Sequence, residues 1–87
     1  MEKSEMRKKV GKMLNNINQY QDKEPTTPQE YKELELLKII HEMSLENIKS
    51  GIFCSPKDYI EQSNNFVILT FIVDEIIERN RLDILEL

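Results

Sequence analysis

The chain has 87 residues, and 32% of them are charged. Twelve Lys and Arg residues against 16 Asp and Glu residues give a net charge of −4, which argues against nucleic acid because phosphate binding depends on a surplus of cations. One Cys excludes a disulfide within the chain, and one His leaves little for a metal site built on imidazole. We expect a single domain over residues 1–87, without a cofactor or a metal.

Targeting and membrane signals are the next features that the sequence lets us judge. The N-terminal segment has no continuous apolar run, so no secretory signal is expected. The longest apolar run, residues 66–73, is far shorter than the ~20 residues that cross a bilayer. We therefore predict a cytoplasmic protein with no membrane contact. The chain lacks Ala and Trp and is rich in Ile, Lys and Asn, whose A/T-rich codons indicate a bacterial, phage or plasmid origin.

The first predicted helix covers residues 3–20. Its apolar residues recur at spacings of four and three, which is the period of an amphipathic helix; they are Met6, Val10, Met13, Ile17 and Tyr20. Residues 21–26 are polar and contain Pro25, so we expect a loop there.

The same helix carries most of the positive charge near its start. Residues 1–12 have a net charge of +3, which leaves −7 for residues 13–87. A basic helix face could contact nucleic acid, and the residues that could do so are Arg7, Lys8, Lys9 and Lys12. Because one short basic turn offers few phosphate contacts, we favour the alternative, a solvated face that could dock on the acidic body of a second copy.

The second predicted helix covers residues 28–50. Thr27 and Glu30 flank Pro28 in the pattern of a capping box, in which the Thr hydroxyl accepts a hydrogen bond from a free backbone N–H. Apolar residues lie on two opposite sides of this helix, which indicates neighbours on both sides. Gly51 can adopt a positive φ and end the helix.

The third predicted helix covers residues 56–80, again after a capping pattern at Ser55 and Asp58. Residues 66–73 are almost wholly apolar and rich in β-branched side chains, which favours a strand. The helix start before this run and the helical pattern after it favour a helix instead. We predict one helix, and keep an α+β fold with a strand at residues 66–73 as the alternative.

A helix that is apolar on every side at its middle would leave part of its surface exposed in a lone three-helix bundle. Exposed apolar patches of several hundred Å² usually mark interaction sites. A C-terminal tail folded back over the helix could cover part of it, but we favour self-association or a protein partner. The predicted interface residues are Phe66, Ile68, Leu69, Phe71, Ile72, Val73, Ile76, Leu82 and Leu85.

Candidate catalytic residues are few. His41 lies on an apolar stripe and could sense pH or act as a base, but no motif joins it to a nucleophile, and we interpret it as half-buried. Cys54 precedes a predicted helix start that could lower its thiol pKa, but we interpret it as a small apolar filler. Two glycines are too few for a phosphate-binding loop. We predict no enzymatic activity.

The sequence therefore predicts an all-α fold, a small self-associating three-helix bundle with helices over residues 3–20, 28–50 and 56–80 and a short C-terminal tail. The expected function is non-enzymatic binding of a protein partner or a second copy, as an inhibitor, immunity factor or regulatory adaptor. The alternative is a nucleic-acid-binding transcriptional regulator that uses the basic N-terminal helix as a dimer.

Overall fold

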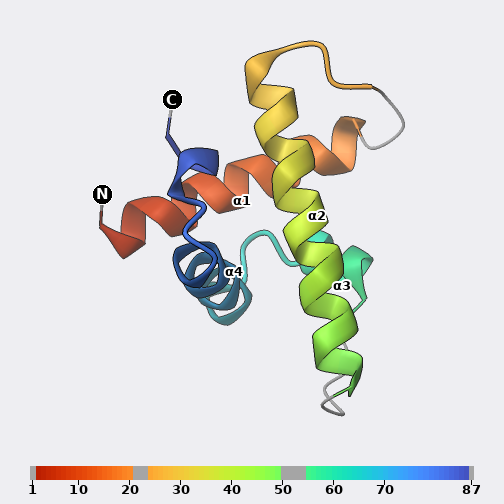
Figure 1. Ribbon diagram of the computed structural model, residues 1–87, viewed down its shortest axis with the longest axis vertical. Helices are drawn as coiled ribbons and strands as arrows, with labels where there is room; N and C mark the ends of the chain where they lie inside the picture. Colours follow the sequence, from red (N-terminus) through yellow and green to blue (C-terminus); the bar gives the residue numbers. More distant parts are fainter. Residues whose placement is uncertain (1, 21–23, 50–54, 87) are drawn as a thin grey trace.

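Helices make up most of the described chain (Figure 1). The structure, a computed structural model, describes residues 2–20, 24–49 and 55–86. Its elements are α1 (Lys3–Tyr20), α2 (Pro28–Lys49), α3 (Pro56–Glu61), α4 (Phe66–Glu78) and the 3-10 helix η1 (Leu82–Ile84). The predicted all-α class is confirmed. Residues 66–73 are helical, so the alternative with a strand there is wrong.

The predicted helix over residues 56–80 is broken in two, which corrects the sequence analysis. Residues 62–65 lie between α3 and α4. The Asn65 side chain accepts hydrogen bonds from the N–H groups of Val67 and Ile68, at 3.0 and 3.2 Å, and so starts α4 as its N-cap. The residues in this gap are Gln62, Ser63, Asn64 and Asn65, and short polar side chains of this kind compete with the helical hydrogen bonds of the backbone.

The two predicted capping patterns are both present. At Ser55 the side chain accepts from the Asp58 N–H, and the Asp58 carboxylate accepts from the Ser55 N–H at 2.9 Å, a complete capping box. At Thr27 the hydroxyl accepts from the Glu30 N–H at 3.1 Å. The Glu30 carboxylate accepts from the hydroxyl of Thr27 instead of its N–H. Both helices therefore begin where the sequence predicts.

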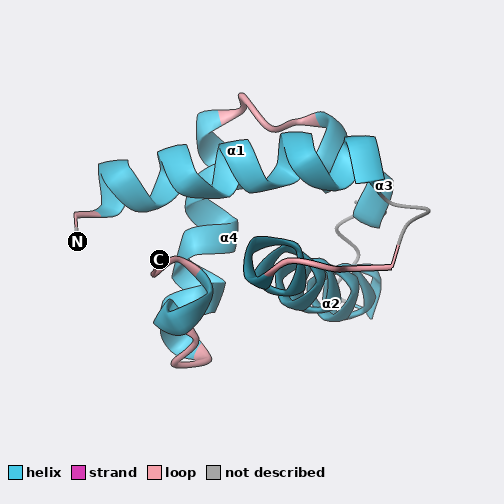
Figure 2. Ribbon diagram, turned by 90° about the horizontal axis from the view of Figure 1, so that it is seen from above, coloured by secondary structure: helices cyan, strands magenta, loops and turns pink. Residues whose placement is uncertain are grey.

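The helices cross rather than run side by side. α2 passes in front of α1 in Figure 1, and the view from above shows α4 leading away from α1 (Figure 2). α1 packs most extensively on α4, while α3 fills the space between α1 and α2. The core between these elements contains fully buried residues from α1, α2 and α4; they include Val10, Leu14, Leu36, Ile40, Ile72, Val73 and Ile76.

The C-terminal segment folds back onto the bundle. Ile84 and Leu85 are buried, and the Lys9 ammonium donates to the Leu85 carbonyl at 2.8 Å. Asn80, with a φ of 57°, allows the chain to turn after α4, and a left-handed Asn is a common way to end a helix. The tail therefore covers part of the core, as one of the sequence alternatives anticipated.

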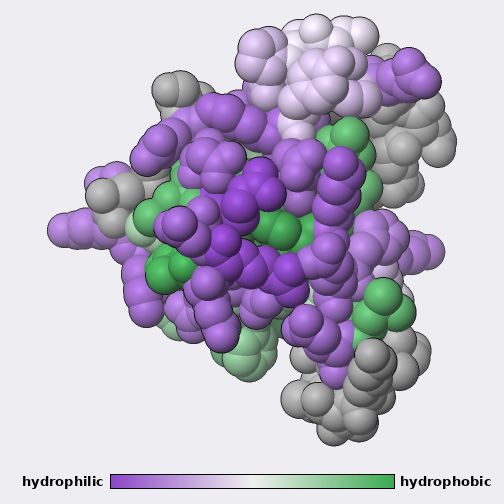
Figure 3. Space-filling view, viewed as in Figure 1, coloured by the Kyte–Doolittle hydropathy of each residue, from purple (hydrophilic) through white to green (hydrophobic). Residues whose placement is uncertain are grey.

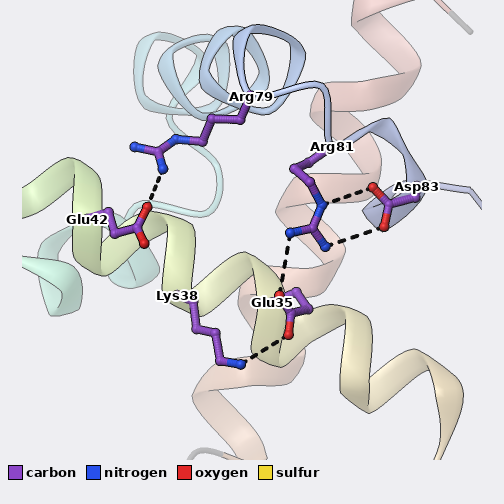
Figure 4. A network of polar contacts seen from close by, with 6 residues as sticks. All are labelled: Glu35, Lys38, Glu42, Arg79, Arg81 and Asp83. Carbon is purple, nitrogen blue, oxygen red and sulfur yellow. Dashed lines mark hydrogen bonds and ion pairs between the residues drawn. The ribbon is translucent and has the colours of Figure 1, made fainter.

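Ion pairs join the end of α4 and the following turn to α2 (Figure 4). Arg79 pairs with Glu42 of α2 and with Glu75 of its own helix, whose Oε1 lies 2.7 Å from the Arg79 Nε. Arg81 pairs with Glu35 at 3.6 Å and with Asp83 at 3.1 Å. These contacts fix α4 against α2 at the C-terminal end of α4, so its N-terminal end is positioned mainly by α1.

Candidate functional site

Three large apolar side chains are exposed at the start of α4. Phe66 is 63% exposed, Val67 57% and Phe71 56%. Val67 and Phe71 are four residues apart and so lie next to each other on the helix. We call these three residues the α4 surface. Val67 and Phe71 lie on the side of α4 away from its core residues, whereas Phe66 lies nearer to α1 and lines the groove described below.

The nine predicted interface residues differ in how far the fold buries them. Five are buried within this chain; they are Leu69, Ile72, Val73, Ile76 and Leu85. Of these five, Leu69 also lines the groove described below. Phe66 and Phe71 are exposed, whereas Ile68 is half-buried against the core. Leu82 is 36% exposed but lies on η1, beyond the opposite end of α4.

Val67 belongs to the α4 surface but was absent from the predicted interface. Helical spacing places it beside Phe71, so periodicity contained the necessary signal. What periodicity could not show is which side of a helix that is apolar all round would be covered. The contacts of α4 with α1 and α2 decide that, and they leave Val67 in solvent.

A groove lies beside the α4 surface, between α1 and the residues that lead into α4. Its volume is about 570 Å³, and the connection between α3 and α4 passes over the side of α1 that faces away from α2 (Figure 2). We call it the basic groove, because three of its lining residues are cationic. The lining is Ser4, Arg7, Lys8, Gly11, Lys12, Asn15, Ser63, Asn64, Phe66 and Leu69.

Gly11 sets how closely the two walls of the groove approach. A Cβ at this position would lie 2.9 Å from the backbone oxygen of Ser63, closer than such atoms pack. One turn further along α1, the Ser63 hydroxyl donates to the Asn15 side chain at 2.9 Å. The floor of the groove is therefore built from a close backbone contact and a hydrogen bond between side chains.

Arg7 joins the basic groove to the α4 surface. Its guanidinium carbon lies 4.4 Å from the centre of the Phe66 ring, within the range of a cation–π interaction. Phe66 thus lines the groove on one side and belongs to the apolar surface on the other. The two features form one continuous surface with a basic part and an apolar part.

The four basic residues predicted to contact nucleic acid do not all lie in one site. Arg7, Lys8 and Lys12 line the groove, and the described residues give none of them an ion pair. Lys9 instead holds the C-terminal segment through the Leu85 carbonyl. Three of the four cations are therefore available to a ligand, and the fourth is structural.

The face that carries α2 is different in character. It is mostly hydrophilic, and hydrophobic atoms show there only in small separate patches (Figure 3). His41 is exposed on α2, not half-buried as the sequence suggested. A second hollow of about 310 Å³ on this side is lined largely by the ion pairs of Arg79 and Arg81. Those charges already have partners, so this hollow is a weaker candidate than the basic groove.

A buried carboxylate lies elsewhere, between α1 and α2. Glu33 is 5% exposed, and its Oε2 has no hydrogen-bond partner among the residues that the structure describes. Burial raises the pKa of Glu33 above its usual value, the hydrogen bond with the Asn16 side chain lowers it, and the nearby Glu30 raises it. Cys54 lies outside the described residues. Within the described residues, no group of three or more His, Cys, Asp or Glu side chains could hold a metal ion.

In the part of the chain that the structure describes, no helix combines the length and apolar character needed to cross a membrane. No protein-family model, curated protein or solved structure matches the chain. The α4 surface and the basic groove are the two features of the described residues that bear on function.

Proposed function

We propose that this chain is a non-enzymatic interaction protein that binds a protein partner through the α4 surface, as an inhibitor, immunity factor or regulatory adaptor. The observation that carries the proposal is the exposure of Phe66, Val67 and Phe71, each more than half in solvent and all at one end of one helix. Single exposed apolar residues are common, but a contiguous group marks an interaction site.

The residue types of this surface suit a protein partner. Aromatic residues and Arg are enriched where protein interfaces contribute most to affinity, and the α4 surface contains two Phe rings with Arg7 beside one of them. α4 presents them on a helix that Asn65 caps and the core holds in place. A partner would therefore meet a preformed surface, which lowers the entropic cost of binding.

A second copy of the chain is one occupant of this surface. The predicted self-association would bring two α4 surfaces together, or one onto another face of a second copy. Because an isologous contact buries the same residues on both copies, a change at Phe71 would weaken a dimer from both sides. Sedimentation velocity over a range of concentrations separates this form from binding to a different protein.

Nucleic acid is the second candidate, and it rests on the three cations of the basic groove, which have no ion pair within the described part of the chain. If the chain binds nucleic acid, a dimer would contact phosphates through Arg7, Lys8 and Lys12. Lys9 would not take part, because it holds the Leu85 carbonyl. Binding would then weaken steeply with salt.

The test is affinity capture from a nuclease-treated lysate of the source cells, using the tagged full chain and two variants. Phe71→Asp changes the α4 surface. Leu45→Asp makes the same kind of change at a 63% exposed residue of α2 and is the matched control. We expect a stoichiometric protein that the unmodified chain and Leu45→Asp retain and Phe71→Asp loses. Equal retention by Phe71→Asp contradicts the proposal, and loss of everything but the bait after nuclease supports nucleic acid.

A further inference from the structure

We infer that the partner segment bound by the α4 surface is acidic as well as apolar, and that its carboxylates lie in the basic groove against Arg7, Lys8 and Lys12. This inference rests on the proposed function, because it specifies the chemistry of the same binding site. It treats the groove and the α4 surface as two parts of one recognition site.

The three cations of the basic groove differ from other cations of the chain in having no carboxylate partner among the described residues. In a chain with a net charge of −4, carboxylates outnumber cations, and several cations of the described residues have carboxylate partners. Lys3 pairs with Asp74 at 3.4 Å, and Arg79 and Arg81 each pair with more than one carboxylate. The three cations of the groove have none within ion-pair distance among the described residues. They are gathered in one place and left without an anion.

The basic groove and the α4 surface are continuous with each other at Phe66. Phe66 belongs to both the groove lining and the α4 surface, and Arg7 lies over its ring. A segment that covers Phe66 and Phe71 with apolar side chains therefore passes along the rim of the groove. Acidic residues on the adjoining side of that segment would meet Lys8 and Lys12 of α1. Complementary charge of this kind adds specificity and speeds association.

The start of α4 forms one wall of the groove. The positive end of the helix dipole lies there and favours a negative charge. Asn65 already binds the N–H groups of Val67 and Ile68, so α4 contributes its dipole more than its backbone donors. The lysines and Arg7 must therefore supply the direct contacts to a carboxylate.

The size of the basic site favours a protein segment over nucleic acid. Arg7 and Lys12 are separated by about 7.5 Å along α1, at ~1.5 Å per residue, which is room for few phosphates. Beyond residue 12 the chain carries a net charge of −7, and a long anionic polymer would meet that charge. A short acidic and apolar segment of a protein would meet only the groove and the α4 surface.

The experiment uses the full chain labelled with ¹⁵N and three probes, followed by NMR titration. The first probe is a synthetic helical peptide with Leu and Phe on one face and Glu on the other. The second is the same peptide with every Glu replaced by Gln, and the third is a single-stranded oligothymidine of similar length. Lys8→Glu/Lys12→Glu tests the groove. Lys38→Glu/Lys57→Glu alters two exposed lysines elsewhere, so its net charge is the same and it is the matched control.

We expect the acidic peptide to shift the amide signals of Lys8, Lys12 and Phe71 and to bind about tenfold more tightly than the Gln peptide at low salt. Lys8→Glu/Lys12→Glu should abolish that difference, and the control variant should keep most of it. Equal binding of both peptides overturns the inference and leaves the proposed function standing. Tighter binding of the oligothymidine, or no shift at these residues with the acidic peptide, also overturns it.

Discussion

Gly11 lies in the middle of α1, where glycine is a poor helix former. Replacing such a glycine with Ala on an exposed helix would stabilise it by about 1 kcal/mol. Here the new Cβ would lie 2.9 Å from the Ser63 backbone oxygen, which cannot move without shifting the connection into α4. The close approach of two backbones explains why glycine occupies this position.

We predict that Gly11→Ala lowers the free energy of unfolding by about 1–2 kcal/mol, because the usual cost of forcing an added group into a packed site, about 1–3 kcal/mol, outweighs the gain of about 1 kcal/mol in helix propensity. Urea unfolding followed by circular dichroism measures this change. An unchanged or higher stability would show that α1 and residue 63 do not approach as closely as described.

Glu33 is a second residue whose property, here its pKa, is set by the residues packed around it. Burial raises the pKa of Glu33, so the folded chain binds this proton more tightly than the unfolded chain does. Its contribution to stability is therefore complete below the ordinary carboxyl pKa and is lost as the pH rises through the raised value.

We predict that Glu33→Gln, which removes the charge, becomes more stable relative to the unmodified chain as the pH rises from about 4 to about 7. Urea unfolding of both proteins across this range gives the difference, in which the contributions of the other carboxylates largely cancel. Parallel profiles for the two proteins would exclude a raised pKa at Glu33.

The structural roles of Gly11 and Glu33 could not have been predicted from the sequence. Gly11 is one glycine in an amphipathic pattern, and Glu33 is one of many carboxylates on predicted helices. Their roles come from what a distant segment places against them, which is residue 63 for Gly11 and α1 for Glu33. The spacing of residues within one helix does not predict contacts with segments that are distant in the sequence.

Among the elements, the break between α3 and α4 has the largest consequence for function. It allows α4 to begin as a separate helix after α3, and it brings Ser63, Asn64 and Phe66 into the wall of the basic groove. A continuous helix over residues 56–80 could not form that wall. The break depends on Asn65, whose side chain binds two N–H groups at the start of α4.

We predict that Asn65→Ala lowers the free energy of unfolding by about 1 kcal/mol, the typical value of an N-cap. Asn65→Asp is the matched control, because Asp caps a helix equally well and should keep the stability near that of the unmodified chain. Thermal unfolding of the three proteins compares them. If Asn65→Ala were as stable as Asn65→Asp, the cap would not be what starts α4.

Helix starts at Thr27 and Ser55 were predictable because a capping box is a local signal. The start at Asn65 was not predicted, although Asn is a favoured N-cap, because an apolar run follows it directly and a helix pattern already precedes it. Two helices whose patterns join without an interruption look like one. The hydrogen bonds of the polar residues 62–65 decide between the two arrangements.

Across the whole molecule, packing decides which apolar residues of α4 remain exposed. The sequence indicated a surplus of apolar surface on residues 66–77, and part of that surplus exists as the α4 surface. Its extent was overestimated, because α4 packs against α1 and α2 and its residues Leu69, Ile72, Val73 and Ile76 are buried. The order in which three helices cross cannot be obtained from the period of any one of them.

The adjacent residues Phe71 and Ile72 test this arrangement. Phe71 is 56% exposed and Ile72 is fully buried. We predict that Phe71→Asp changes the free energy of unfolding by about 1 kcal/mol or less, whereas Ile72→Asp abolishes cooperative unfolding because it places a charge in the core. Thermal melts followed by circular dichroism distinguish the two, and an unfolded Phe71→Asp variant would mean that Phe71 is part of the core.

The most direct test of the central claim is photo-crosslinking inside the source cells, with a benzophenone amino acid placed at position 71 or, as the control, at position 45. Both positions are more than half exposed, on α4 and α2 respectively. The α4 surface predicts one discrete crosslinked product from position 71, with a partner protein or a second copy, and none from position 45. The same product from both positions, or a discrete product from position 45 alone, would contradict the claim.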